Sequence, residues 1–125
     1  MILVIGGASQ GKRAWAEEHY PGRTWIDGAV CSREELFACE AVDHFHLYLR
    51  RQLEAGCDLT DLAEELCRRN PELLLVSTEI GYGIVPADAF ERDYREAVGR
   101  VCTKLAAGSR QVVRVVCGLG TVIRG

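Results

Sequence analysis

The chain has 125 residues, of which 48% are hydrophobic and 26% charged, and its formal net charge at pH 7 is −3. This length and hydrophobic content suit a single domain over residues 1–125, because no Pro-, Gly- or Ser-rich linker divides the sequence. The net charge is slightly negative and the arginines are spread along the chain, so the sequence lacks the clustered basic residues typical of a nucleic-acid-binding protein. The apolar start is too short for a signal peptide and no run is long enough to span a bilayer. We therefore expect a cytoplasmic protein that binds neither nucleic acid nor membrane.

The first motif is a glycine-rich turn that follows a short apolar run. Gly6, four intervening residues, Gly11 and Lys12 match the phosphate-binding pattern G-x-x-x-x-G-K. Glycines permit the tight fold-back in which backbone N–H groups converge on a phosphate, and the lysine adds a positive charge. The alternative is an ordinary strand-to-helix turn with a solvated lysine. The predicted phosphate site comprises Gly6, Gly7, Ala8, Ser9, Gln10, Gly11, Lys12 and Arg13.

Arg13 stands where the pattern has a Ser or Thr hydroxyl that holds Mg²⁺. Its presence means either that magnesium binding is lost or that a guanidinium neutralises phosphate charge in place of the metal. Because Mg²⁺ also shapes the in-line geometry of transfer, an arginine should support binding better than turnover. The expected ligand is therefore GTP or ATP, with Mg²⁺ disfavoured by Arg13. No Asn-Lys-x-Asp motif selects guanine over adenine.

Strand-like and helix-like segments alternate along the chain. Continuous apolar runs are typical of strands covered on both faces, and apolar residues three and four apart are typical of helices. This alternation predicts an α/β fold in which a phosphate loop precedes a mostly parallel sheet with helices on both faces. We expect the last two strands to form a hairpin-like pair. The predicted strands are Ile2–Ile5, Arg23–Ile26, Leu73–Ser77, Val112–Cys117 and Thr121–Ile123, and the predicted helices are Lys12–His19, Arg33–Glu40, His46–Glu54, Leu59–Asn70 (capped by Asp58 or Thr60) and Phe90–Ala106.

Two histidines, His44 and His46, lie in the segment Val42–Arg51, whose apolar residues fit both strand and helical spacing. Side chains two residues apart share a face in a strand and diverge in a helix. Either histidine could act as a nucleophile, activated by a neighbour such as Asp43. The simpler alternative is one structural histidine packed beside Phe45 and one solvated histidine. A metal pair would need a third ligand that the sequence does not identify.

A carboxylate, Glu79, follows the predicted strand Leu73–Ser77. In phosphate-loop enzymes a carboxylate at such a place can hold a magnesium-bound water or orient the attacking group. The alternative is that it caps the next turn. Gly81, Gly83 and Pro86 then predict a sharply turned loop that could form a wall for a bulky ligand.

The six cysteines are scattered, and no C-x-x-C pair indicates a zinc or redox site. Cys67, Cys102 and Cys117 lie in apolar segments, where reduced cysteine acts as a small buried residue. We expect no metal site.

Several segments together resemble the adenosylcobinamide kinase/adenosylcobinamide-phosphate guanylyltransferase family. The most specific is Ser77-Thr-Glu-Ile-Gly-Tyr-Gly-Ile-Val-Pro86, in register with the N-terminal Ile2-Leu-Val-Ile-Gly-Gly. The resemblance extends to Tyr94–Arg100, Lys104–Ala107 and Val115–Leu119. It implies a RecA-like protein of cobalamin biosynthesis that phosphorylates the aminopropanol hydroxyl of adenosylcobinamide. The family then transfers GMP from GTP onto that phosphate through a guanylylated histidine. The implied partners are a nucleotide, a corrinoid and further copies of the chain, often in a trimer.

Three departures from the family pattern limit what the resemblance carries over. Arg13 replaces a serine, Thr78 replaces an asparagine, and the middle of the chain is much shorter and lacks the family's H-x-x-x-R-P-like setting. The nucleophilic histidine is therefore not identified by matching, and Glu79, His46 and His44 stand as catalytic candidates. Two alternatives stay open: a degenerate module that binds a nucleotide or corrinoid without turnover, and a phosphate-loop kinase of another small alcohol.

Overall fold

A computed structural model of the chain describes residues 1–80 and 88–125. These residues form a six-stranded sheet in the order β2-β3-β4-β1-β5-β6, parallel throughout except for the antiparallel β5–β6 pair. The nearly continuous apolar runs of β1 and β4 are buried on both faces, which places them at the centre of the sheet. The predicted mostly parallel α/β fold with a C-terminal hairpin is confirmed. The strands are β1 (Ile2–Gly6), β2 (Trp25–Asp27), β3 (Ala41–Asp43), β4 (Leu74–Thr78), β5 (Gln111–Val116) and β6 (Leu119–Arg124).

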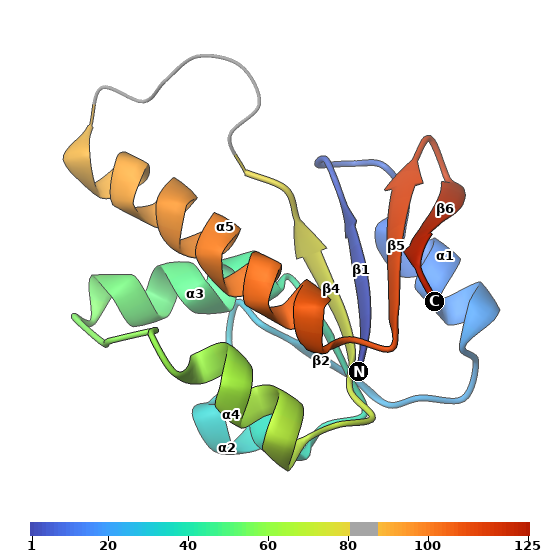
Figure 1. Ribbon diagram of the computed structural model, residues 1–125, viewed down its shortest axis with the longest axis horizontal. Helices are drawn as coiled ribbons and strands as arrows, with labels where there is room; N and C mark the ends of the chain where they lie inside the picture. Colours follow the sequence, from blue (N-terminus) through green and yellow to red (C-terminus); the bar gives the residue numbers. More distant parts are fainter. Residues whose placement is uncertain (81–87) are drawn as a thin grey trace.

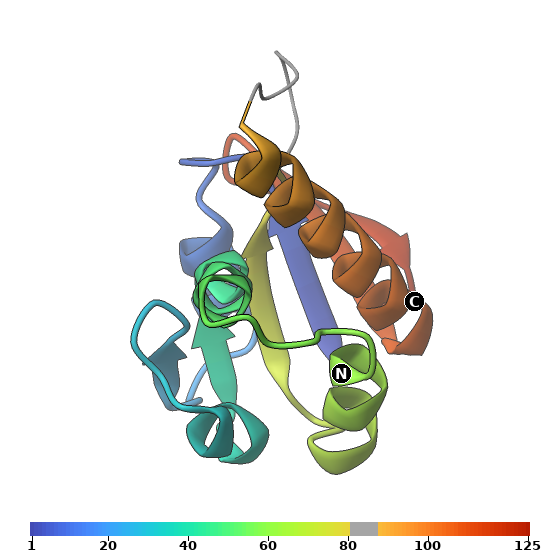
Figure 2. The same ribbon diagram turned by 90° about the vertical axis from the view of Figure 1, so that its left-hand side faces the viewer.

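Helices cover both faces of the sheet, and Figure 1 shows α1 on one side and α2 to α5 on the other. Alternate side chains of β1 pack on opposite faces of the sheet. Val4 packs in the cluster that contains Ala16 of α1, whereas Leu3 packs in the larger core with Leu105 of α5. Figure 2 turns that larger helical layer toward the viewer. None of the helices in the described part of the chain is both long and apolar enough to cross a membrane. The helices are α1 (Lys12–His19), α2 (Arg33–Ala38), α3 (Phe45–Glu54), α4 (Leu62–Arg69) and α5 (Ala89–Gly108).

The predictions for the segment Val42–Arg51 and for the cap of α4 differ from the structure. The segment Val42–Arg51 fits both periods because it contains both elements: the unpredicted strand β3 ends at Asp43, and α3 begins at Phe45. The predicted cap of α4 is wrong, since α4 begins at Leu62. The Asp58 carboxylate instead accepts hydrogen bonds from the backbone N–H and the hydroxyl of Thr60, at 2.9 and 2.5 Å.

The cysteines divide by environment. Cys67 and Cys102 are half-buried and pack against the larger core, in line with the prediction. The prediction for Cys117 is wrong, because this residue is exposed in the turn between β5 and β6 with a left-handed φ of 51°. Although Cys117 continues the apolar run of β5 in the sequence, it lies where the chain reverses direction into β6, so its side chain is not buried in the sheet.

Candidate functional site

The predicted phosphate loop lies at the carboxyl end of the central strand β1 and leads directly into α1 (Figure 1). Ser9 and Gly11 adopt left-handed φ values of 59° and 82°, which fold the chain back before the helix. Gly6 is required for a different reason. A Cβ atom there would lie 2.4 Å from the carbonyl oxygen of Val115 on the neighbouring strand.

The loop lines a cavity of about 410 Å³ together with residues from the ends of two other strands. Because β1, β3 and β4 run parallel, their carboxyl ends meet at one edge of the sheet. The structure therefore brings both predicted histidines to the phosphate loop. The residues that line this cavity are Ala8, Ser9, Gln10, Gly11, Lys12, Arg13, Ala14, Asp43, His44, His46 and Thr78.

The Lys12 side chain is buried beneath the loop rather than extended into solvent, with 8% of the residue exposed. Its Nζ donates a hydrogen bond to the carbonyl oxygen of Gly7 at 2.7 Å. Burial lowers the pKa of Lys12, and the nearby carboxylates of Asp43 and Glu79 oppose that shift. An anionic ligand at the loop would supply the counter-charge that a buried ammonium needs.

The residue after Lys12, Arg13, is held by groups from three elements. Its Nε donates to Glu17 of α1 at 2.6 Å, and its Nη1 lies 3.7 Å from Oδ2 of Asp43 at the end of β3. The guanidinium carbon lies 4.6 Å from the ring centroid of Trp25 on β2. Arginine therefore occupies the usual position of a magnesium ligand in a defined orientation.

His44 is placed between two strand-end carboxylates. It immediately follows β3 in a left-handed conformation, with a φ of 54°, and precedes the first turn of α3. Its Nδ1 lies 3.0 Å from Oδ1 of Asp27, and its Nε2 lies 3.8 Å from Oδ2 of Asp43. With Nδ1 donating to Asp27, the Nε2 of a neutral ring carries a lone pair that can act as a base or nucleophile.

The Asp27 carboxylate that orients His44 is kept ionised. A hydrogen bond from the Ala29 backbone N–H, at 2.9 Å, is the main cause that lowers the pKa of Asp27, and the His44 imidazole adds to it. Gly28 allows this approach, because a Cβ atom at position 28 would lie 2.4 Å from the carbonyl oxygen of His44. The Gly28 N–H also donates to the carbonyl oxygen of Asp43 at 2.7 Å.

His46 is more buried than His44, and the two rings are 6.1 Å apart. Burial lowers the pKa of His46 to about 4, and electrostatic interactions with His44 and Lys12 add to the effect. Its Nδ1 accepts a hydrogen bond from the Thr78 N–H at 3.4 Å. This bond leaves the ring proton on Nε2, so His46 has no uncommitted lone pair for attack. His44 is the better arranged of the two candidates.

Glu79 lies beside the phosphate-loop cavity rather than in it. Its backbone N–H donates to the carbonyl oxygen of Gly6 at 2.8 Å, which continues the pairing of β4 with β1. Its carboxylate accepts a hydrogen bond from Nη2 of Arg114 at 3.2 Å. Glu79 lines a second, mostly apolar cavity of about 260 Å³ with Ile5, Thr78, Ile80, Val98, Gly99 and Cys102. Thr78 lines both this apolar cavity and the phosphate-loop cavity, so the two cavities adjoin there.

Sequence reasoning missed two features of this site. The sequence does not identify Asp27 as a partner of His44, although Asp27 follows the apolar pair Trp25 and Ile26 of β2 as Glu79 follows β4. Asp43 was treated only as a sequence neighbour of the histidines, because β3 is too short to be recognised from its apolar residues. The loop predicted from Gly81, Gly83 and Pro86 lies outside the described residues.

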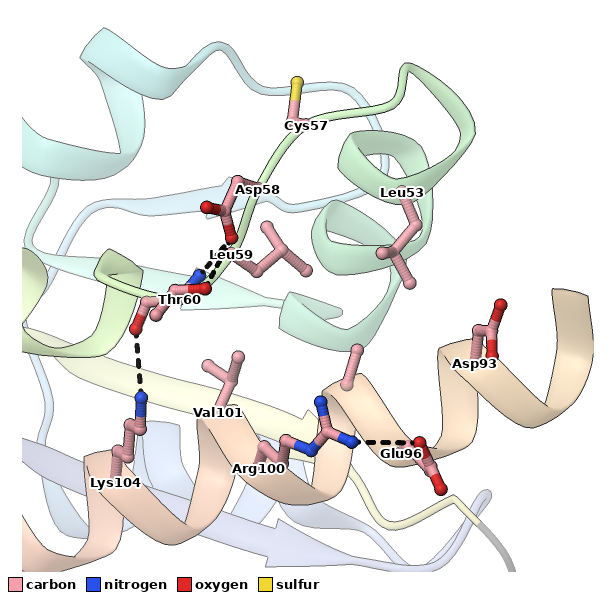
Figure 3. Close-up of a pocket in the computed structure, with 11 residues that line it drawn as sticks. Leu53, Cys57, Asp58, Leu59, Thr60, Asp93, Glu96, Arg100, Val101 and Lys104 are labelled. Carbon is pink, nitrogen blue, oxygen red and sulfur yellow. Dashed lines mark hydrogen bonds and ion pairs between the residues drawn. The ribbon is translucent and has the colours of Figure 1, made fainter.

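A further cavity of about 420 Å³ lies between α5 and the connection from α3 to α4 (Figure 3). Both of its basic side chains are already paired: Arg100 donates to Glu96 at 3.0 Å, and Lys104 donates to the carbonyl oxygen of Thr60 at 3.0 Å. It lies along the side of α5, whereas ligands of parallel sheets bind at the carboxyl ends of strands. The phosphate-loop cavity is therefore the candidate functional site.

Comparison with known proteins indicates the family of the chain. A family model for cobinamide kinase / cobinamide phosphate guanyltransferase matches residues 24–123, which begin downstream of the phosphate loop. The chain is also similar to the bifunctional adenosylcobalamin biosynthesis protein CobU of Escherichia coli (strain K12) and that of Salmonella typhimurium (strain LT2). It is 42% identical to each over 59 residues, which are 46% of this chain and 33% of each relative. The matched stretch thus spans a third of the length of these relatives.

Proposed function

Because the chain belongs to the cobinamide kinase / cobinamide phosphate guanyltransferase family, we propose that it is a nucleotide-binding transferase of cobalamin biosynthesis. The nucleotide is GTP or ATP, and the acceptor is adenosylcobinamide or its phosphate. One observation carries the proposal: the phosphate loop, Lys12 and His44 line the same cavity at the carboxyl edge of the sheet. A phosphate donor and a nucleophile for phosphorus can therefore meet there.

His44 is the nucleophile in the proposed guanylyl transfer. The lone pair of its Nε2 attacks the α-phosphorus of GTP, and the bond from that phosphorus to the pyrophosphate leaving group breaks. A phosphate oxygen of adenosylcobinamide phosphate then attacks the same phosphorus, and the N–P bond breaks to return the imidazole. Asp27, 3.0 Å from Nδ1, holds the ring and stabilises its positive charge in the intermediate.

Glu79 belongs to the acceptor side of the proposed reaction. Its carboxylate borders the apolar cavity that adjoins the phosphate loop at Thr78. An apolar cavity with one carboxylate suits an acceptor that presents a hydroxyl group, because the carboxylate can accept a hydrogen bond from that group. In phosphorylation of adenosylcobinamide, the Glu79 carboxylate would accept a hydrogen bond from the aminopropanol hydroxyl that attacks the phosphate.

A second candidate function is nucleotide or corrinoid binding without turnover. The observation that favours it is Arg13, which takes the place of a magnesium ligand and faces Asp43. A site that binds phosphate through fixed cations gains affinity without the metal-dependent geometry of phosphoryl transfer.

Covalent labelling separates the two functions. The protein is incubated with GTP labelled at the α-phosphate, and the intact mass is followed before and after adenosylcobinamide phosphate is added. We expect one GMP per chain, discharged by the acceptor. Label should be lost in His44→Gln and retained in His46→Gln and in the control His19→Gln on the outer surface of α1.

Three results would change the assignment. Label that persists in His44→Gln would remove the nucleophilic role from this residue. Nucleotide binding without label or turnover would favour the binding module. Turnover with a different alcohol in a substrate panel would identify a kinase of another small molecule.

A further inference from the structure

The residues at the usual magnesium position do not form a metal site. Phosphate-loop enzymes hold Mg²⁺ between the hydroxyl that follows the loop lysine and a carboxylate at a strand end. Here the first of these positions is Arg13, whose guanidinium has no lone pair to offer a metal. The second is Asp43, at the end of β3. A cation and an anion therefore face each other where two metal ligands would be.

One oxygen of Asp43 already accepts a hydrogen bond, and the other faces the guanidinium of Arg13. Its Oδ1 accepts from the His44 N–H at 2.7 Å, and its Oδ2 lies 3.7 Å from Nη1 of Arg13 and 3.8 Å from Nε2 of His44. A divalent ion brought to Oδ2 would meet the guanidinium at close range and be repelled by it. Across residues 1–80 and 88–125, no group of three or more His, Cys, Asp or Glu side chains could hold a metal ion.

The guanidinium of Arg13 is itself well placed to bind a phosphate. Glu17 and Trp25 hold it beside the loop, and the partly exposed side chain lines the same cavity as Ser9 and Lys12. Arginine offers five N–H donors in a planar fork that matches phosphate oxygens. The contact with Asp43, at 3.7 Å, is too long for a hydrogen bond, so Nη1 can turn toward a ligand at little cost.

We propose that this site binds nucleotide phosphates without a divalent cation, with the Arg13 guanidinium neutralising the charge that a metal ion would otherwise neutralise. This inference rests on the proposed nucleotide binding and specifies the bound form, which is metal-free GTP or ATP. Lys12 binds from beneath the loop, and Arg13 binds from the side of β2 and β3. Arg13 thus determines which form of the nucleotide is selected.

Calorimetric titration with GTP and with ATP, each in EDTA and in MgCl₂, tests the proposal. The parent should bind as tightly in EDTA as in magnesium. In EDTA, Arg13→Ser should weaken binding by about tenfold to hundredfold, because a charged hydrogen-bond donor is lost. Magnesium should restore part of this loss, because the new hydroxyl is a metal ligand. Arg13→Lys, which keeps the charge but loses the planar fork, should be weakened less in EDTA.

Arg100→Ser is the matched control, because Arg100 lies on the exposed face of α5, pairs with Glu96 and does not line the phosphate-loop cavity. It should bind as the parent does in both media. Circular dichroism of each variant establishes that it is folded. A parent that binds tenfold or more weakly in EDTA, or an Arg13→Ser variant that binds normally there, would overturn this inference and leave nucleotide binding intact. A parent that binds neither nucleotide in either medium would overturn the proposed function as well.

Discussion

At the scale of single residues, burial sets the charge of His46. The imidazole lies between α3 and the end of β4, and its pKa is lowered to about 4 from 6.5, the ordinary value. Between these two pH values the unfolded chain binds a proton at His46 that the folded chain does not bind. The free energy of unfolding therefore rises with pH across this interval, and the contribution is lost as the pH falls from 6.5 toward 4.

Urea unfolding at a series of pH values measures this effect. Relative to His46→Gln, the parent should lose unfolding free energy between pH 7 and pH 4; about 3 kcal/mol is the upper bound, and solvent screening of the partly exposed ring reduces it. The comparison between variants removes the contribution of the carboxylates, which titrate in both proteins. Parallel pH profiles for the two proteins would show that His46 is not held neutral by the fold.

Alanine substitutions at two glycines test the close backbone contact between Gly28 and His44. A Cβ atom on Gly28 would lie 2.4 Å from the carbonyl oxygen of His44 and 3.0 Å from that of Asp43, and backbone atoms yield little. Gly28→Ala should therefore destabilise the fold by about 1–3 kcal/mol and weaken nucleotide binding.

Gly99 is the matched control, because it lies within α5 and no atom lies within 4 Å of an added Cβ. Gly99→Ala should stabilise the protein by about 0.5–1 kcal/mol. Thermal unfolding measures both, and equal effects would contradict the steric argument.

At the scale of elements, the β5–β6 hairpin holds the phosphate loop. The turn between these strands donates two hydrogen bonds to Gln10: the Cys117 N–H binds its side-chain oxygen at 2.7 Å, and the Gly118 N–H binds its carbonyl oxygen at 2.8 Å. The left-handed residues Ser9 and Gly11 flank this anchor. The loop is thus held in its folded-back shape before a ligand arrives, which reduces the ordering cost of binding.

Gln10→Ala removes one of the two bonds and leaves the other. The loss of one hydrogen bond should weaken nucleotide binding by roughly twofold to tenfold, measured by titration. The unfolding free energy should change by less than about 1 kcal/mol, because the affected turn is exposed. Gln52→Ala on α3, away from the loop, serves as the control and should not change the affinity. Equal affinities for parent and Gln10→Ala would show that the bond from the Cys117 N–H to the Gln10 side chain does not shape the loop.

How well an element could be predicted depended on its length and burial. The strands β1 and β4 have five residues each and long apolar runs, and α1 carries a full amphipathic turn after its loop, so all three are evident in the sequence. In contrast, β3 has three residues and becomes a strand only because β2 and β4 pair with it on either side. Tertiary pairing of this kind leaves no periodic signal in so short a segment.

The candidate site shows the same division. The phosphate loop is a local motif, and its residues were predicted from spacing alone. The dyad of Asp27 and His44 joins residues 17 apart in sequence, and only the parallel pairing of β2 with β3 brings them together. The outward turn of Cys117 was missed because a hairpin interrupts an apolar run that otherwise continues a strand.

At the scale of the whole molecule, ligand binding at one edge of the sheet should stabilise the entire fold. The cavity is lined by residues at the ends of β1, β3 and β4, and these strands carry core residues of both faces. Unfolding of any of them would dismantle the site, so a bound nucleotide must dissociate when the domain unfolds. Mass action then links affinity to the midpoint of thermal unfolding.

GTP at a hundredfold excess over its Kd should add about 2.7 kcal/mol to the unfolding free energy. For a domain of this size the midpoint should rise by roughly ten degrees. Lys12→Ala should remove most of the rise, because it deletes the ammonium that is buried under the loop, 2.7 Å from the Gly7 carbonyl oxygen, and leaves the phosphates to Arg13 and the backbone. Lys104→Ala, on the far side of α5 at the cavity of Figure 3, should show the full rise. A rise that survives Lys12→Ala in full would show that Lys12 does not bind the phosphates, although it lines the phosphate-loop cavity.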